Sequence, residues 1–171
     1  MTEANLYHQK ILLTGASGFV GSAIRIALQS AGAEVVGVSR SGIGGTRARQ
    51  VAADSDWTDL LEGVTCVVHA AAVVHFLSDK DRPTEQVYRD VNVDGTLALA
   101  RQAAEAGVER FVFISTAKVA GEGNNSGRQA YKENDDPQPQ GAYSLSKWYA
   151  EEGLTDLSRS SSSQSGMQRK D

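Results

Sequence analysis

Short apolar runs alternate with amphipathic stretches along the first half of the chain. Residues 11–13 are apolar and lead into a cluster of glycines, and residues 19–31 then carry apolar side chains at helical spacing. Apolar residues return at 34–39, a loop rich in glycine and arginine follows at 41–47, and residues 50–53 form a weaker apolar segment. The pattern predicts strand, turn, helix, second strand and third strand.

The second half continues this alternation. Residues 66–72 are apolar without alternation, which is typical of a strand covered on both faces of a parallel sheet. Pro83 opens a long helical stretch that is stopped at Gly107. Residues 110–116 form a fifth strand, rich in valine, isoleucine and phenylalanine, and residues 143–157 form a last helix.

Two further segments complete the pattern. Residues 57–61 are expected to form a short helix, and residues 121–140 are polar and rich in turn-forming residues, which predicts a long loop. Such a loop in a compact domain is usually functional or disordered. Strands that alternate with helices imply right-handed crossovers, so the predicted fold class is α/β, with a doubly wound parallel sheet (Rossmann fold).

Composition narrows the possible partners. The 171 residues are 40% hydrophobic, which suffices for one substantial core but not for two large ones. The net charge of -4 creates no broad positive field, so we expect no nucleic-acid partner. No apolar run approaches the roughly 20 residues that span a bilayer, and residues 1–10 do not resemble a secretory signal. We therefore expect a soluble cytoplasmic domain with no membrane partner.

The glycine cluster has the sequence T-G-A-S-G-F-V-G and stands between a predicted strand and a predicted helix. One glycine permits backbone angles closed to other residues, a second lets the main chain approach a pyrophosphate, and a third lets helix and strand pack closely. The anion would lie on the free amides at the helix start. This motif predicts a dinucleotide site formed by Gly15, Ser17, Gly18, Phe19, Val20 and Gly21.

The end of the second predicted strand bears on the choice of cofactor. Dinucleotide folds often carry an acidic residue there, which binds the ribose hydroxyls, whereas an arginine accommodates a 2′-phosphate. This chain has Ser39 and Arg40 at that place, with Arg47 and Arg49 close in sequence. We therefore predict NADP slightly ahead of NAD. The alternative is that Arg40 is only a solvated surface charge.

Tyr143 and Lys147 are four residues apart in the last predicted helix, so they share one helix face. A phenol is a poor acid or base at neutral pH, and an adjacent ammonium favours its ionised form. Tyr143 would then exchange a proton with a hydroxyl or carbonyl group while hydride passes to or from a nicotinamide. Taken alone, this pair also arises by chance on many helices.

Three further motifs accompany these two. They are V-V-H-A-A-A at 67–72, N-V-D-G-T at 92–96 and F-I-S-T-A-K-V-A-G at 113–121. With all five motifs in this order, residues 9–157 resemble the extended short-chain dehydrogenases/reductases. The resemblance is nearest to the nucleotide-sugar epimerases, dehydratases and 4-keto reductases of bacterial surface-polysaccharide synthesis.

The resemblance implies catalytic roles for four residues. Thr116 matches the residue whose hydroxyl binds the reacting oxygen, and Ser115 is the neighbouring candidate. Tyr143 matches the acid/base, and Lys147 matches its activating partner and a ribose ligand.

The resemblance also implies further cofactor contacts. Asp54 and Ser55 match the adenine contacts, residues Ala70, Ala71 and Ala72 would lie along the cofactor, and Asn92 would brace that region. His69 is expected to pack and hydrogen-bond beside the cofactor rather than act as a base. The three histidines of the chain are too scattered to suggest a metal site.

At the level of function, the resemblance implies an NAD(P)-dependent enzyme that acts on a nucleotide-linked sugar and forms a homodimer through the helices at 92–106 and 143–157. Two alternatives stay open. One is a reductase of a non-sugar carbonyl of the steroid or flavonoid type, and the other is a non-catalytic dinucleotide-binding module.

The resemblance extends only over the first part of such enzymes. Members of the family continue after the tyrosine–lysine helix with another strand and a smaller domain that contacts the sugar nucleotide. Residues 158–171 hold a serine run and one large apolar residue, Met167, so they predict a disordered tail. We therefore expect a cofactor-binding domain at 1–157 without the substrate domain.

Overall fold

The computed structural model describes residues 6–74, 83–122 and 130–167, with side chains as far as residue 160. Five parallel strands form one sheet in the order β3-β2-β1-β4-β5. The strands are β1 (Lys10–Thr14), β2 (Glu34–Ser39), β3 (Arg47–Ala48), β4 (Cys66–His69) and β5 (Arg110–Phe113). The sequence-based prediction of a doubly wound parallel sheet is confirmed.

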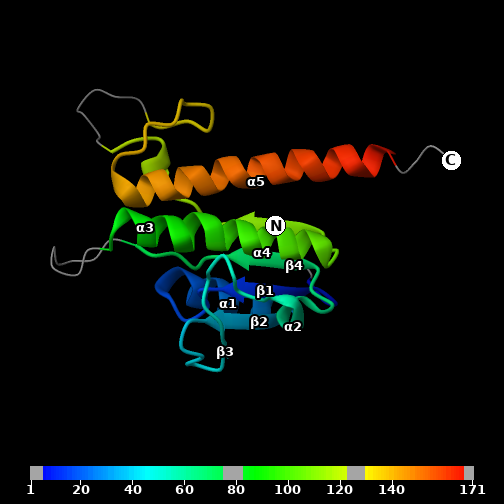
Figure 1. Ribbon diagram of the computed structural model, residues 1–171. Helices are drawn as coiled ribbons and strands as arrows, with labels where there is room; N and C mark the ends of the chain where they lie inside the picture. The colour runs from blue at the N-terminus through cyan, green and yellow to red at the C-terminus, as the bar shows by residue number, and fades with distance from the viewer. Residues whose placement is uncertain (1–5, 75–82, 123–129, 168–171) are drawn as a thin grey trace.

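Helical segments connect the strands (Figure 1). They are α1 (Phe19–Ser30), α2 (Thr58–Leu61), α3 (Glu85–Tyr88), η2 (Arg89–Gly95), α4 (Thr96–Glu105), η3 (Ala117–Val119) and α5 (Gly141–Met167). In the described part of the chain, no helix has the length and apolar character needed to cross a membrane.

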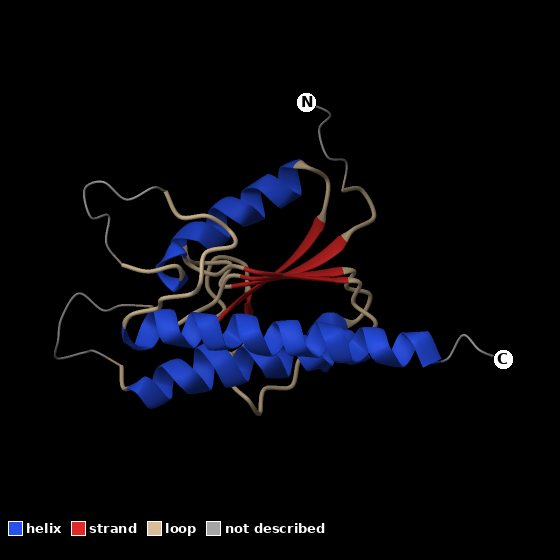
Figure 2. Cartoon of the chain, turned by 90° about the horizontal axis from the view of Figure 1, so that it is seen from above, coloured by secondary structure: helices blue, strands red, loops and turns tan. Residues whose placement is uncertain are grey.

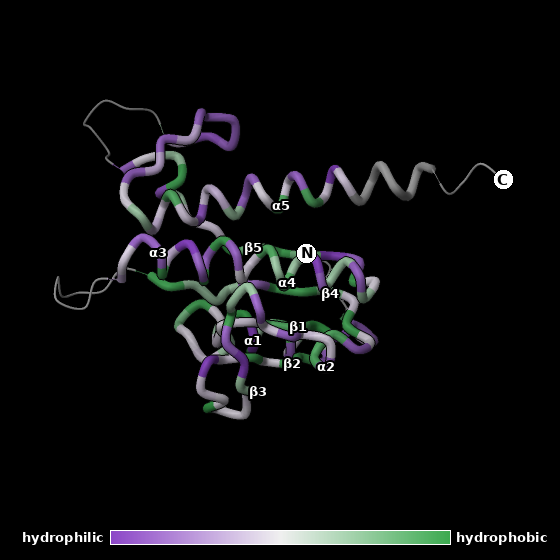
Figure 3. Tube along the Cα trace, viewed as in Figure 1, coloured by the Kyte–Doolittle hydropathy of each residue, from purple (hydrophilic) through white to green (hydrophobic). Residues whose placement is uncertain are grey.

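The sheet lies between two helical layers, with α1 on one face and α4 and α5 on the other (Figure 2). Alternation along β1 supplies both cores, since successive side chains of a strand point to opposite faces. Ile11 and Leu13 belong to a cluster that Ile24 of α1 covers, whereas Leu12 belongs to the cluster on the α4 face with the fully buried Trp57. The strands are mostly hydrophobic, and the loop before α5 is hydrophilic (Figure 3).

The long helix predicted from residue 83 to residue 106 is interrupted. Its middle, η2, is π-helical, between the α-helical turns α3 and α4. At this point the helix closely approaches the loop after β3, because a Cβ on Gly95 would lie 2.8 Å from Val51 Cγ1 and 2.9 Å from the Ala52 nitrogen. A π-turn is a feature that periodicity alone does not predict.

The helix α5 extends to Met167, whereas the sequence predicted an end at Leu157 and a disordered tail from Ser158 onward. Two hydroxyls at this end of the helix donate to the carbonyl four residues earlier: Thr155 Oγ1 to Glu151 and Ser160 Oγ to Asp156, each at 2.9 Å. No proline interrupts the segment. The helix therefore continues past Leu157, while the domain boundary at residue 157 stays a prediction and residues 168–171 of the predicted tail lie outside the described residues.

Candidate functional site

The turn between β1 and α1 is held by glycine. Gly15 has φ +68°, and a Cβ there would lie 2.7 Å from the Ala71 nitrogen. A Cβ on Gly21 would lie 2.1 Å from the Gly15 carbonyl oxygen. Gly18 differs, because its φ of -77° is open to any residue and a Cβ would meet only the Gly15 oxygen, at 3.2 Å. A Cβ at Gly15 or Gly21 would collide with backbone, whereas a Cβ at Gly18 needs only a small shift of the Gly15 carbonyl.

A pocket of about 580 Å³ opens at the carboxyl ends of β1, β2 and β4. This is where ligands bind in open α/β sheets, at the point where the strand order reverses. Half of the predicted cofactor residues line the pocket: Gly15, Ser17, Gly18, Ser39, Arg40, Ala70, Ala71 and Ala72. Asn92, Tyr143 and Lys147 do not line it.

Three predicted residues of the glycine motif do not line the pocket. Gly21 is buried beneath Gly15, and the side chain of Phe19 is 95% exposed at the start of α1. Val20 is also exposed. These residues form the first turn of the helix, whose amides have no partner within the helix. These three residues can therefore contact a phosphate through their backbone amides, but not through their side chains.

Asp54 and Ser55, the predicted adenine contacts, do not line the pocket. The reason is that β3 lies earlier in the chain than the predicted 50–53, so other residues follow its carboxyl end. Gln50 and Val51 line the pocket instead, and Ser55 Oγ donates a hydrogen bond to the Gln50 carbonyl at 2.9 Å. Because β3 is short and ends early, Gln50 and Val51 occupy the place at the pocket that was expected for Asp54 and Ser55.

Asn92 braces the wall that follows β4. Its side-chain Oδ1 accepts from the Val73 nitrogen at 2.8 Å, and its Nδ2 donates to the Val73 carbonyl at 2.9 Å. The same Nδ2 donates to Ser146 Oγ at 2.9 Å, and Ser146 in turn donates to the Tyr143 carbonyl at 2.7 Å. The pocket wall is therefore linked to α5 through buried polar groups. Ser146 was not predicted from the sequence.

Tyr143 lies near this wall, with its ring centroid 6.4 Å from that of Tyr88. Burial raises the pKa of the Tyr143 hydroxyl, while a side-chain hydrogen bond with Thr116 and the charge of Lys118 lower it. The net direction is upward, so Tyr143 is protonated at neutral pH. Ser115, the neighbouring candidate, has a buried Oγ with no hydrogen-bond partner among the described residues. The structure thus brings Thr116, rather than Ser115, to the tyrosine hydroxyl.

Lys147 is almost fully buried, and its Nζ lies 3.7 Å from the centroid of the Phe113 ring. Burial lowers the pKa of Lys147 to about 8, against a smaller opposing effect of Glu151. The charge of Lys118 favours the ionised form of Tyr143, and the activating role of Lys147 stays a prediction. The contact between the Lys147 ammonium and the Phe113 ring depends on how α5 packs on β5. It keeps the ammonium over the face of the ring.

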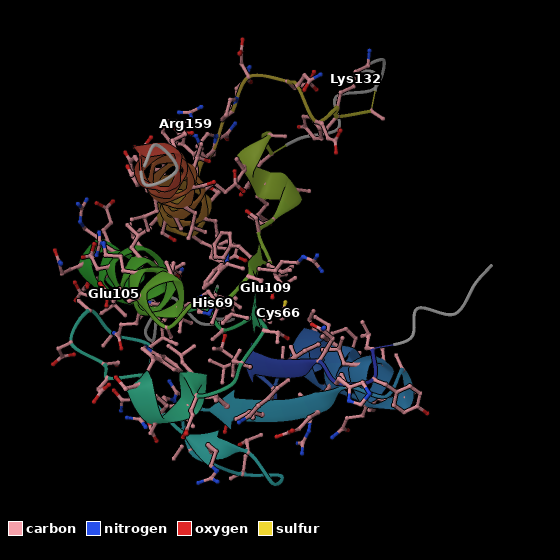
Figure 4. All side chains as sticks on the ribbon, turned by 90° about the vertical axis from the view of Figure 1, so that its right-hand side faces the viewer. Cys66, His69, Glu105, Glu109, Lys132 and Arg159 are labelled. Carbon is pink, nitrogen blue, oxygen red and sulfur yellow. The ribbon has the colours of Figure 1, made fainter. Side chains whose placement is uncertain are left out.

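His69 is fully buried between the sheet and the helices (Figure 4). Burial, and secondarily the charge of Lys147, lowers the pKa of His69 to about 3. Its ring nitrogens bond Thr14 and Thr96, and its ring stacks on Phe113 at 5.9 Å. The imidazole packs beside the pocket as expected. The sequence analysis did not identify Phe113 as a site residue. Phe113 lies opposite His69 in the β4–β5 register, so pairing the two predicted strands would have placed it beside the histidine.

Comparison with known proteins places this geometry among relatives. Residues 11–166 match the family described as NAD dependent epimerase/dehydratase family. A UDP-glucose 4-epimerase of Vibrio cholerae is 38% identical over 160 residues, which cover 90% of this chain and 48% of that protein.

Two solved structures share the fold. A short-chain dehydrogenase/reductase superfamily protein from Agrobacterium tumefaciens with bound NAD is 33% identical, with a TM-score of 0.70 over 85% of this chain and 44% of that one. A UDP-glucose-4-epimerase from Stenotrophomonas maltophila with bound NAD and formylated UDP-arabinopyranose is 27% identical, with a TM-score of 0.73 over 90% of this chain and 49% of that one.

The chain spans about half the length of these relatives. The family match covers the sheet, the pocket and nearly all of α5 together. The protein therefore belongs to the NAD dependent epimerase/dehydratase family.

Proposed function

We propose that the chain binds a nicotinamide dinucleotide in the pocket at the ends of β1, β2 and β4 and takes part in epimerisation, dehydration or 4-keto reduction of a nucleotide-linked sugar. The observation that carries the proposal is the hydrogen bond between Thr116 and Tyr143, which lies on a helix that Asn92 and Ser146 link to the wall of that pocket. Relatives named as UDP-glucose 4-epimerases support the sugar substrate.

The pocket suits the proposed cofactor. Gly15 and Gly18 leave the backbone bare where a pyrophosphate must approach, and a Cβ on Gly18 would project toward that space rather than into the protein core. When bound, the nicotinamide would accept or deliver hydride at the sugar carbon.

The residues of this chain would manage the proton. Tyr143, kept protonated by burial, would donate from its hydroxyl to a keto oxygen or accept a proton back from the sugar hydroxyl. Thr116 would hold the same oxygen through its hydroxyl. Lys147, whose pKa is lowered to about 8, lies one turn further along α5 and would contact the ribose.

The choice between NAD and NADP is part of the proposal. Arg40 lines the pocket and is exposed, whereas Arg49, which also lines it, is paired with Asp59 at 2.6 Å. Arg40 is thus the cation that a 2′-phosphate would meet, which supports binding of NADP. The two solved relatives carry NAD, so the NADP preference expected from the sequence has no support from them.

A homodimer is also proposed, through the outer surfaces of α4 and α5. The two helices pack tightly against each other, since a Cβ on Gly153 would lie 2.8 Å from Leu97 Cδ1. Tyr149 on α5 is 46% exposed and offers an apolar ring to a second copy. Sedimentation across a concentration series tests this, and a monomer mass throughout would contradict it.

The function is tested by calorimetry with NAD and NADP, followed by incubation with UDP-sugars and a search for a keto-sugar or epimer product. We expect dinucleotide binding by the chain, and conversion of a UDP-sugar where the domain that contacts the sugar nucleotide is also supplied. Tyr149→Phe serves as a matched control for substitutions at Tyr143, because both residues lie on α5. Absence of dinucleotide binding would contradict the proposal at its first step.

A further inference from the structure

A chain of buried hydrogen bonds crosses the molecule beneath the pocket, through His69. The Ala71 nitrogen donates to Thr14 Oγ1 at 3.2 Å, and Thr14 Oγ1 lies 2.6 Å from His69 Nδ1. On the other side of the ring, His69 Nε2 lies 2.9 Å from Thr96 Oγ1, which donates to the Asn92 carbonyl at 2.8 Å. Thr14, His69 and Thr96 are fully buried, so water takes no part.

The donor and the acceptor of each of these hydrogen bonds follow from the last acceptor in the series, the Asn92 carbonyl. A backbone carbonyl only accepts, so the Thr96 hydroxyl spends its single proton on Asn92 and must accept from His69 Nε2. In a neutral imidazole the other nitrogen is then an acceptor, and Thr14 donates to it. Thr14 Oγ1 is left free to accept from the Ala71 amide.

A charged imidazole would break this order. With protons on both nitrogens, His69 would donate to Thr14 Oγ1, and the Thr14 hydroxyl proton would lose its acceptor at Nδ1. The deep burial of the ring, which lowers the pKa of His69 to about 3, excludes that state at neutral pH. The arrangement therefore has one consistent set of protons.

We propose that His69 is a positioning residue. Thr96 sets its tautomer, and the imidazole in turn orients Thr14 so that Thr14 Oγ1 accepts from the Ala71 amide. This bond holds the pocket wall at residues 70–73 in place for the dinucleotide. Thr14 and Ala71 both line the pocket, whereas Thr96 does not. Thr96 contacts the imidazole of His69 and the backbone carbonyl of Asn92, the residue whose side chain bonds Val73. The inference rests on the proposed function, because it assigns the wall to dinucleotide binding.

The test replaces Thr96 by valine, which has nearly the same shape without the hydroxyl. His69 Nε2–H then loses its buried acceptor, and loss of such a bond favours the other tautomer, with the proton on Nδ1. Nitrogen-15 shifts of the imidazole distinguish the two tautomers. We expect Nε2–H in the wild type and in Thr96→Ser, and Nδ1–H in Thr96→Val.

Dinucleotide binding is measured on the same proteins by calorimetry. We expect Thr96→Val to weaken the affinity for NAD or NADP about tenfold, a coupling typical of residues in one hydrogen-bonded network, and Thr96→Ser to restore it. Thr65→Val is the matched control, because Thr65 Oγ1 bonds Gln9 at 2.7 Å at the opposite end of β4. It is expected to lower the thermal midpoint without changing the affinity.

Two outcomes overturn the inference: an unchanged tautomer in Thr96→Val, or a changed tautomer with unchanged affinity. If the wild type binds no dinucleotide, the proposed function fails, and amide exchange of Ala71 decides the inference separately. Faster exchange at Ala71 in Thr96→Val but not in Thr65→Val supports the role of His69. Equal exchange in the wild type and Thr96→Val contradicts it.

Discussion

The cofactor pocket and the Tyr143 site differ in what they are made of. After β1 and β4 the pocket is lined by glycine, serine and alanine, which contribute mainly by being small and leaving the backbone exposed. The Tyr143 site is built from side chains whose chemistry depends on burial and on neighbours from η3, α3 and β5. A backbone site can be recognised in a sequence by its glycines, whereas a side-chain site is defined only once the helices are packed.

The largest effect is expected from the side-chain site. Tyr143→Phe removes the hydroxyl that bonds Thr116 and would lower turnover by roughly 10²–10⁴-fold, the usual contribution of a general acid–base group. Dinucleotide affinity should change little. Hydride transfer with a UDP-sugar is the measurement, and Tyr149→Phe is the control. An equal loss of turnover in Tyr143→Phe and Tyr149→Phe would contradict the catalytic role of Tyr143.

The backbone site is tested by Gly18→Val. The backbone angles of Gly18 suit any residue, so we expect the thermal midpoint to stay within a few degrees of the wild type, while the side chain blocks the pyrophosphate. A loss of about a hundredfold or more in dinucleotide affinity is expected, corresponding to roughly 3 kcal/mol. Calorimetry measures the affinity, with Ser22→Ala as the control. Unchanged affinity would contradict the location of the pyrophosphate.

The Tyr143 site also differs from the pocket because the buried Lys147 there is expected to make the free energy of unfolding depend on pH. Burial lowers the pKa of Lys147 from 10.5 to about 8, so the unfolded state binds more protons between these values. Stability should therefore rise as the pH increases from about 8 to about 10, and the cost of burying the charge is fully present below pH 8. Lys147→Met would remove up to about 3 kcal/mol of that cost at pH 7.

Denaturant unfolding at several pH values measures this effect. The wild type should gain free energy of unfolding from pH 8 to pH 10, and Lys147→Met should show little of that gain. Lys118→Met, which alters a half-exposed lysine in an ion pair with Glu122, serves as the control. Parallel pH curves for the wild type and Lys147→Met would exclude a buried lysine with a lowered pKa.

The smallest expected effect concerns the rim of the pocket. Arg40→Asp exchanges a cation suited to a 2′-phosphate for an acceptor suited to ribose hydroxyls, and should shift the affinity ratio toward NAD by about tenfold. Arg47→Asp is the control, since Arg47 is exposed and does not line the pocket. A ratio that does not move would leave Arg40 as a surface charge.

The sequence predicted the sheet and the glycine turn because both follow from local patterns. It did not place Asp54 and Ser55 outside the pocket, because the end of β3 is fixed by its register with β2, where Val38 pairs with Arg47. That register depends on contacts between segments, not on composition within one. The ring beneath Lys147 was missed for the same reason, since Phe113 meets α5 only after β5 has joined the sheet.

The π-helical segment η2 acts as a one-residue insertion between two α-helical turns. A π-turn takes about one residue more than an α-turn, so the segment accommodates the extra residue without turning α3 out of phase with α4. Val87 and Val91 thereby keep their places in the pocket wall, and the ring of Tyr88 stays beside that of Tyr143. Removing one residue from an ordinary α-helical turn has no such compensation and rotates the two flanking parts of a helix by roughly 100° relative to each other.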